Sequence, residues 1–272
     1  MKLEAKQITK QFGSQTALDH VDLTIENGEF FGLLGTNGAG KTTMIRILST
    51  LMLPTSGTVL ADGEELTRSR VELKKKITVM TQEYTLRNDM SIEEILEYQG
   101  RLYHVPKAKR RARAEELMEL TGLSEHRKKL IRHLSGGMKR KVMLCRALLP
   151  EPEIILLDEP TVGLDPIFRH QMWELLRKLN EQGVGFLLTT HYLEEAQQLC
   201  KRVTFLKEGR VVATGVPSQI VDELGAFCVE QGSETNLFRT QEEALEHLRL
   251  HGGKLRDTSL EDVFFRLSGG GA

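Results

Sequence analysis

The chain has 272 residues, of which 40% are hydrophobic and 28% are charged, and its 37 basic and 38 acidic residues give a formal net charge of −1. This length suits one large globular domain with or without a small addition, and the hydrophobic content excludes a wholly disordered chain. The balanced charge argues against a strongly basic nucleic-acid-binding surface, so we expect no nucleic-acid partner.

Membrane-spanning and secreted classes are also disfavoured. No stretch approaches the roughly 20 consecutive apolar residues that a transmembrane helix needs, and the N-terminus lacks the apolar core of a signal peptide. Cys145, Cys200 and Cys228 have no metal-binding spacing, which predicts small core residues in a reducing compartment. We therefore expect a cytosolic protein that reaches a membrane through a partner.

Alternating strands and helices predict an α/β core with a mostly parallel sheet. A helix is predicted to begin near Lys41, and Ser91 with Glu94 resembles a capping box at the start of a helical region that extends to residue 122. A further amphipathic helix is predicted over 169–182. The predicted strands cover residues 2–8, 17–25, 30–34, 76–81, 153–157, 186–190 and 203–206.

The character of the sequence changes after Pro217. Residues 218–272 contain one short helix, an apolar patch at 226–229, a helical run at 240–251 and a final amphipathic segment, which predicts a small C-terminal appendage. Residues 268–272 read Ser-Gly-Gly-Gly-Ala, typical of a flexible end or an expression scar.

A phosphate-binding loop is the first functional pattern. Residues 35–42 read Gly-Thr-Asn-Gly-Ala-Gly-Lys-Thr and match G-x-x-x-x-G-K-[ST] between an apolar strand and a helix. Glycines let backbone N–H groups surround a phosphate, and the helix N-terminus favours its negative charge. Lys41 is predicted to reach the β- and γ-phosphates, and Thr42 to bind Mg²⁺. By itself, the loop indicates only a P-loop NTPase, a class that includes GTPases, kinases and motor proteins.

An apolar strand at 153–157 ends in two acids, Asp158 and Glu159. Adjacent carboxylates at a buried strand end are unfavourable unless a cation or proton chemistry uses them. Asp158 is predicted to hold Mg²⁺, and Glu159 to act as the general base toward the water that attacks the γ-phosphate.

The segment Leu-Ser-Gly-Gly-Met-Lys-Arg at 134–140 resembles the signature motif of the ABC ATPase family. The resemblance covers residues 1–215. It implies that Ser135, Gly136 and Gly137 contact the γ-phosphate of ATP bound by a second subunit. Met138 stands where glutamine is commonest and Thr36 where proline is frequent, and neither departure removes a phosphate contact.

The resemblance implies roles for further residues. Gln82 matches the loop glutamine that touches Mg²⁺, the attacking water and the transmembrane partner. Asp165 lies in the loop that couples the two sites of a dimer. His191 matches the switch histidine that contacts the γ-phosphate. With the adenine-stacking aromatic included, the residues expected to bind ATP are Phe12, Gly35, Thr36, Asn37, Gly38, Ala39, Gly40, Lys41, Thr42 and Thr43. The expected catalytic residues are Glu159, His191 and Gln82, and the expected Mg²⁺ ligands are Thr42, Gln82 and Asp158.

The family also implies an architecture: an ABC ATPase domain at 1–217 with an N-terminal antiparallel β subdomain and a helical signature subdomain at roughly 86–150, followed by the appendage at 218–272. The interval from Lys41 to Leu134 leaves no room for the long coiled coil of chromosome-structure ATPases. A single cassette is expected to form a homodimer.

Residues 259–264 resemble the ending of cassettes from drug, polysaccharide and sodium exporters, which pair with separate permeases. We therefore expect an ATPase of an ABC-2-type exporter, held on the cytoplasmic face of a membrane by its permease. A soluble regulatory or assembly ATPase without a permease and an importer cassette are the alternatives. The basic runs at 107–113 and 127–129 are expected to be solvated helix faces or to lie near lipid headgroups or the permease.

Overall fold

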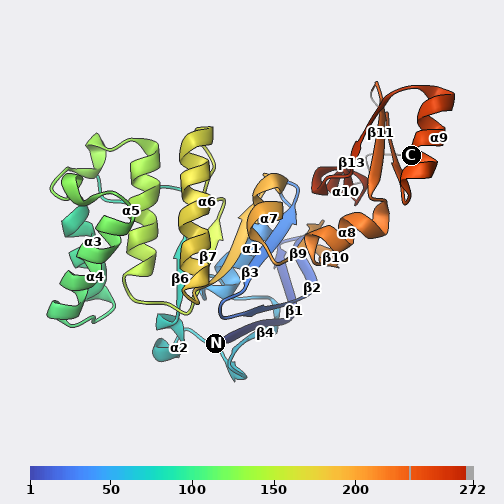
Figure 1. Cartoon of the computed structure of the whole chain (residues 1–272). Helices are drawn as coiled ribbons and strands as arrows, with labels where there is room; N and C mark the ends of the chain where they lie inside the picture. Colours follow the sequence, from blue (N-terminus) through green and yellow to red (C-terminus); the bar gives the residue numbers. More distant parts are fainter. Residues whose placement is uncertain (233, 268–272) are drawn as a thin grey trace.

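The computed structural model describes residues 1–232 and 234–267, in three sheets with helices packed around them (Figure 1). The first sheet is antiparallel, with strand order β2–β1–β4–β5. Polar and apolar residues alternate in β2, so one face of this sheet is buried and the other is solvated. The strands are β1 (Lys2–Phe12), β2 (Gln15–Glu26), β4 (Ser56–Ala61) and β5 (Glu64–Glu65). The predicted N-terminal antiparallel β structure is confirmed, and β4 and β5 complete it.

The second sheet has the order β10–β9–β3–β8–β7–β6 and supports the site. Its five strands from β9 to β6 are parallel, and β10 pairs antiparallel to β9. Every residue of β3, β7 and β8 is buried, as expected for apolar strands covered on both faces. The strands are β3 (Phe30–Gly35), β6 (Ile77–Met80), β7 (Ile154–Asp158), β8 (Gly185–Thr190), β9 (Arg202–Lys207) and β10 (Arg210–Gly215). The α/β core is therefore confirmed.

Helices of this region fall into two groups. Figure 1 shows α3, α4 and α5 together on one side of α6, and α1 and α7 beside the sheet. The Ser91–Glu94 capping box starts α3 as predicted. The helices are α1 (Lys41–Leu48), α2 (Val71–Lys75), α3 (Ile92–Leu102), α4 (Lys107–Leu120), α5 (Gly136–Leu148), α6 (Pro166–Glu181) and α7 (Leu193–Leu199). None of the described helices is both long and apolar enough to cross a bilayer.

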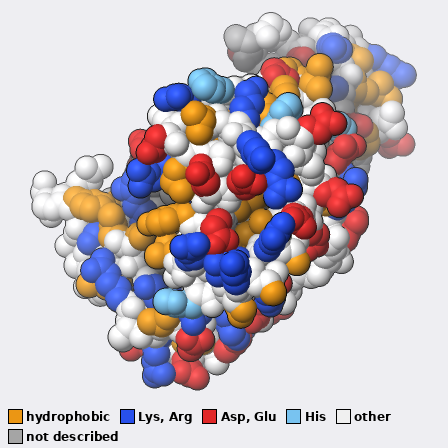
Figure 2. Space-filling view, turned by 90° about the vertical axis from the view of Figure 1, so that its left-hand side faces the viewer, with side chains coloured by type: hydrophobic (Ala, Val, Ile, Leu, Met, Phe, Trp, Pro, Cys, Tyr) orange, Lys and Arg blue, Asp and Glu red, His pale blue; other side chains and the backbone are white. Residues whose placement is uncertain are grey.

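The basic run at 107–113 lies on α4, and its cations have acidic neighbours. Lys109 pairs with Glu151, and Arg110 donates to Glu97 from both Nε and Nη2. Figure 2, which views the molecule from the side that carries the helical group, shows Lys and Arg side chains mixed with Asp and Glu. This mixture fits a solvated helix face, since paired cations leave little unbalanced charge for an anionic surface.

The C-terminal segment forms a sheet that the sequence pattern did not predict. β11 (Phe227–Gln231) is the predicted apolar patch, and it lies between β12 (Glu234–Phe238) and β13 (Lys254–Asp257) in an antiparallel sheet. The remaining helices are α8 (Pro217–Leu224), α9 (Gln241–His251) and α10 (Leu260–Leu267). Leu260 and Val263 of α10 are fully buried in the same hydrophobic core as α6 and α7. The predicted tail at 268–272 lies outside the described residues, and the division at residue 217 stays a prediction.

Asp262 fastens α10 to β13. It accepts hydrogen bonds from Arg256 Nη1 and Nη2 at 2.7 and 2.8 Å and from the Ser259 backbone N–H at 2.7 Å. Burial by itself would raise the pKa of Asp262, but these hydrogen bonds outweigh burial and lower the pKa to about 2.

We expect Asp262→Asn to lower the free energy of unfolding at pH 7 by about 1 kcal/mol, since solvent screens part of the ion pair. The folded-state pKa of Asp262 is below its unfolded value, so the carboxylate stabilises the fold above about pH 4, and this stabilisation is lost as the pH falls toward 2. Urea unfolding should therefore show that the difference in free energy of unfolding between wild type and Asp262→Asn becomes smaller between pH 4 and pH 2. A difference that is constant with pH would contradict the assignment.

Candidate active site

The loop between β3 and α1 has the shape of a phosphate cradle, and glycine is required to build it. Gly40 has φ of +107°, and a Cβ there would lie 2.5 Å from the carbonyl oxygen of Ala17. A Cβ on Gly35 would lie 2.4 Å from the carbonyl oxygen of Leu206. Both positions exclude a side chain, so the backbone turns tightly around the space above the first turn of α1.

Lys41 lies across this loop. Its Nζ donates to the carbonyl oxygens of Gly35 at 2.8 Å and Thr36 at 3.1 Å, and the residue is 7% exposed. Burial lowers the pKa of Lys41, while the charges of Glu159 and Asp158 oppose that effect. A buried ammonium held by carbonyls can exchange these weak acceptors for phosphate oxygens.

Asp158 ends β7 directly beside the loop. Its Oδ1 accepts from the Thr42 hydroxyl at 3.2 Å and from the Thr189 hydroxyl at 2.8 Å, and the side chain is buried. A carboxylate and a hydroxyl at this spacing are hard oxygen donors, which suit Mg²⁺. The residues present therefore fit the ion that the sequence predicts.

Glu159 and His191 form the second pair. His191 Nδ1 lies 2.7 Å from Glu159 Oε2, because β7 and β8 are neighbouring parallel strands whose carboxyl ends meet at one edge. Glu159 has φ of +51°, and its N–H donates to the Thr189 carbonyl oxygen at 3.0 Å. A left-handed non-glycine residue costs about 1–3 kcal/mol and is typical of functional sites.

The signature segment lies apart from these residues. Ser135 caps α5 and accepts the Met138 N–H at 3.3 Å, while Asp165 caps α6 and accepts the Phe168 N–H at 3.0 Å. A Cβ on Gly137 would lie 2.7 Å from the Phe168 ring, so only glycine lets α5 approach α6 this closely. Figure 1 shows α5 and α1 on opposite sides of α6.

Of the predicted residues, the structure therefore brings together Lys41, Thr42, Asp158, Glu159 and His191. Phe12 ends β1 and is 47% exposed, with Lys10 Nζ 5.2 Å from its ring centroid. Gln82 is exposed beyond the end of β6, and among the described residues no hydrogen bond joins it to Asp158 or Lys41.

Two buried charged residues behind the site were missed by sequence reasoning. Glu195 of α7 is fully buried, and its Oε1 accepts from the hydroxyl of Thr161 and the indole N–H of Trp173, both at 3.0 Å. Burial raises the pKa of Glu195. The one signal in the sequence is its i, i+4 spacing from Leu199, which places both on the inner face of α7. The second residue, Arg140, is 2% exposed and is the last residue of the signature segment, to which sequence reasoning gave no role.

Residues 18–162 match the model of the ABC transporter family, a span that begins before the phosphate loop and ends after Glu159. The chain belongs to the ABC transporter family as an ATP-binding subunit. Members of this family are ATPases, and their cassettes work as dimers with permease components in the membrane.

Curated relatives of this ABC subunit are ATP-binding proteins of export and of drug resistance. It is 36% identical to the Nod factor export ATP-binding protein I of Cupriavidus metallidurans over 98% of this chain and 97% of that one. It is 41% identical to a daunorubicin resistance ATP-binding protein of Streptomyces coeruleorubidus, covering 79% of this chain and 68% of that one. A linearmycin resistance ATP-binding protein of Bacillus subtilis is 36% identical, with 84% and 74% covered.

Solved structures show the same cassette fold. The ATP-binding subunit of an ABC transporter superposes with a TM-score of 0.77 at 27% identity, covering 98% of this chain and 99% of that one. A dimeric ATP-binding cassette in a post-hydrolysis state, bound to ADP and Pi, gives a TM-score of 0.71 at 32% identity, with 79% and 98% covered.

Proposed function

We propose that this subunit powers an exporter and hydrolyses ATP with Glu159 as the general base, in a homodimer that shares its two sites. The observation that carries the proposal is the Glu159–His191 contact of 2.7 Å at the same sheet edge as Lys41, Thr42 and Asp158. Export is supported by relatives that are named for Nod factor export and for daunorubicin and linearmycin resistance.

In this mechanism, the loop glycines and Lys41 bind the phosphates of ATP, and Phe12 stacks on adenine. Thr42, Asp158 and Gln82 would hold Mg²⁺, which supplies positive charge against the β- and γ-phosphates. Glu159 accepts the proton of the attacking water, and His191, hydrogen-bonded to Glu159, orients that carboxylate and contacts the γ-phosphate. Asp165 places the loop that faces the second subunit.

The separation of Ser135 from the phosphate loop supports a site completed by a second copy. We expect Ser135→Ala to lower ATP turnover by about 10-fold or more, because one donor to the transition-state charge is lost. The affinity of a single chain for ATP should change less than twofold. Steady-state turnover and nucleotide titration measure the two quantities, with Ser124→Ala, an exposed serine elsewhere, as the control. An equal loss of ATP affinity and turnover in Ser135→Ala would contradict the assignment of Ser135 to the partner's site.

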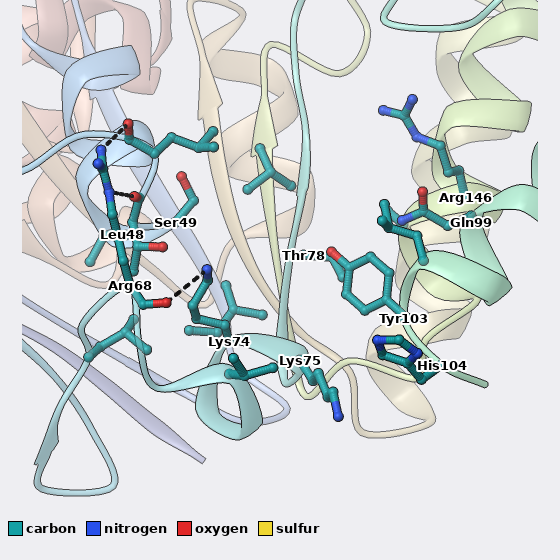
Figure 3. A pocket seen from close by; sticks show the side chains of 18 residues that line it. Leu48, Ser49, Arg68, Lys74, Lys75, Thr78, Gln99, Tyr103, His104 and Arg146 are labelled. Atoms are coloured by element: carbon teal, nitrogen blue, oxygen red, sulfur yellow. Dashed lines mark hydrogen bonds between the residues drawn. The ribbon is translucent and has the colours of Figure 1, made fainter.

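A cavity of about 610 Å³ between the core and the helical group supports a permease contact (Figure 3). Arg68 and Lys74 lie on one side of it, and Gln99, Tyr103 and Arg146 on the other. Leu51, Val71 and Leu102 line it too and are each more than half exposed. Exposed apolar residues with basic neighbours suit an amphipathic, acidic cytoplasmic segment of a permease.

Leu102→Glu should therefore abolish co-purification with the permease from detergent. The isolated subunit should keep its ATP turnover within about twofold, because a surface substitution at this residue barely changes the free energy of unfolding. Leu250→Glu, at an exposed leucine of α9, is the matched control. Retained co-purification of Leu102→Glu would exclude the cavity as the docking site.

Recovery of the wild-type subunit without any membrane protein of about six spans would favour a regulatory ATPase, and a solute-binding protein in the complex would favour an importer.

A further inference from the structure

Arg140 is a buried cation in an unusual environment. It lies one turn into α5, is 2% exposed, and forms no ion pair with a carboxylate among the described residues. Burying an unpaired guanidinium is unfavourable unless hydrogen bonds and rings replace water. The groups that contact the Arg140 guanidinium therefore indicate the role of this side chain.

Those groups come from two loops of the site, the loop from Thr81 to Thr85 and the loop between Glu159 and Asp165. Nη1 donates to the Thr81 carbonyl oxygen at 3.2 Å, directly before Gln82, and Nη2 donates to the Val162 carbonyl oxygen at 3.5 Å, in the loop between Glu159 and Asp165. The guanidinium carbon lies 4.8 Å from the centroid of the Tyr84 ring. The planar fork of arginine can contact both carbonyls and the ring at once, which a lysine cannot.

Tyr84 closes the connection back to the signature. Its hydroxyl donates to the carbonyl oxygen of Gly136 at 3.3 Å, in the first turn of α5 and next to Ser135. Farther along α5, Arg146 donates to the carbonyl and hydroxyl oxygens of Thr85, both at 2.7 Å. The loop from Thr81 to Thr85 is thus attached to α5 at three places.

We propose that Arg140 is a positioning residue that makes the Gln82 loop and the signature helix move as one unit, so that displacement of the loop by the permease displaces Ser135. This inference rests on the proposed function, in which Ser135 faces the partner's ATP, and on the family resemblance, which implies that the Gln82 loop contacts the permease. Through Val162, the same side chain connects the unit to the loop that carries Asp165.

The test compares Arg140→Gln and Arg140→Lys with Ser135→Ala and with Arg177→Gln, an exposed arginine of α6, in the full chain. Arg140→Gln should lower kcat about 10-fold or more, leave the ATP affinity of the single chain within twofold, and weaken ATP-driven dimerisation in the Glu159→Gln background. Arg140→Lys should be impaired similarly, because an ammonium lacks the planar fork that reaches carbonyls on two loops while it packs on the Tyr84 ring.

A second variant keeps the test decisive if Arg140→Gln does not fold. Tyr84→Phe retains the ring and removes only the hydroxyl contact to Gly136, and kcat should fall about threefold without a change in ATP affinity. Wild-type kcat in Arg140→Gln or Tyr84→Phe, or full activity in Arg140→Lys, would overturn the inference. Wild-type kcat in Ser135→Ala would instead overturn the shared site of the proposed function.

Discussion

Glu159→Gln should reduce ATP turnover by about 10²–10⁴-fold, the range for loss of a general base, while ATP still binds. Glutamine has the shape of glutamate, so it can keep the contact to His191 and the left-handed backbone at residue 159. It cannot accept a proton from water. Turnover measured by phosphate release, together with ATP binding measured by equilibrium titration, separates these effects.

The control is Glu194→Gln, which removes the same charge from an exposed position on α7, close to His191 in sequence. Its turnover should remain within about twofold of wild type, because exposed charges contribute little. Near-normal turnover in Glu159→Gln would show that another group accepts the proton. Loss of ATP binding in Glu159→Gln would show that the carboxylate acts in binding.

Lys41→Met should weaken ATP binding by about 100-fold, because charge-assisted hydrogen bonds to phosphate are each worth roughly 1.5–3 kcal/mol. Methionine keeps much of the apolar stem and removes the ammonium that now contacts Gly35 and Thr36. Titration with a fluorescent ATP analogue measures the change.

Lys128→Met, at an exposed lysine, controls for the loss of one positive charge. ATP affinity in Lys41→Met within about threefold of wild type would contradict the placement of Lys41 on the phosphates, since such a change is below the energy of one charge-assisted hydrogen bond. Unfolding measurements should show that the fold persists, because Lys41 makes no ion pair with any described carboxylate.

Features fixed by short stretches of sequence were predicted well. The phosphate loop and the strand that ends at Asp158 depend on neighbouring residues: glycines at required turns in one case, an unbroken apolar run in the other. Glu159 and His191 were each expected at the end of a strand, whereas the 2.7 Å contact between them was not predicted and results from the pairing of β7 with β8. Element type was therefore predictable wherever local pattern and tertiary environment agree.

Features that depend on distant partners were not predicted. β12 and β13 are short and polar, and pairing with β11 rather than their own pattern makes them strands. Arg140 and Glu195 have charged side chains that are usually exposed, yet their partners lie up to 59 and 34 residues away in sequence. Only the folded chain brings these groups together.

In the proposed mechanism, each ATP site is completed by a second copy of this chain. Light scattering of the Glu159→Gln protein with Mg²⁺ and ATP tests it most directly, because blocked hydrolysis should hold the closed state. We predict twice the monomer mass with ATP, the monomer mass with ADP, and the monomer mass with ATP when Ser135→Arg is added. A Glu159→Gln protein that binds ATP at full occupancy and stays monomeric would show that the second copy is not needed to complete the site.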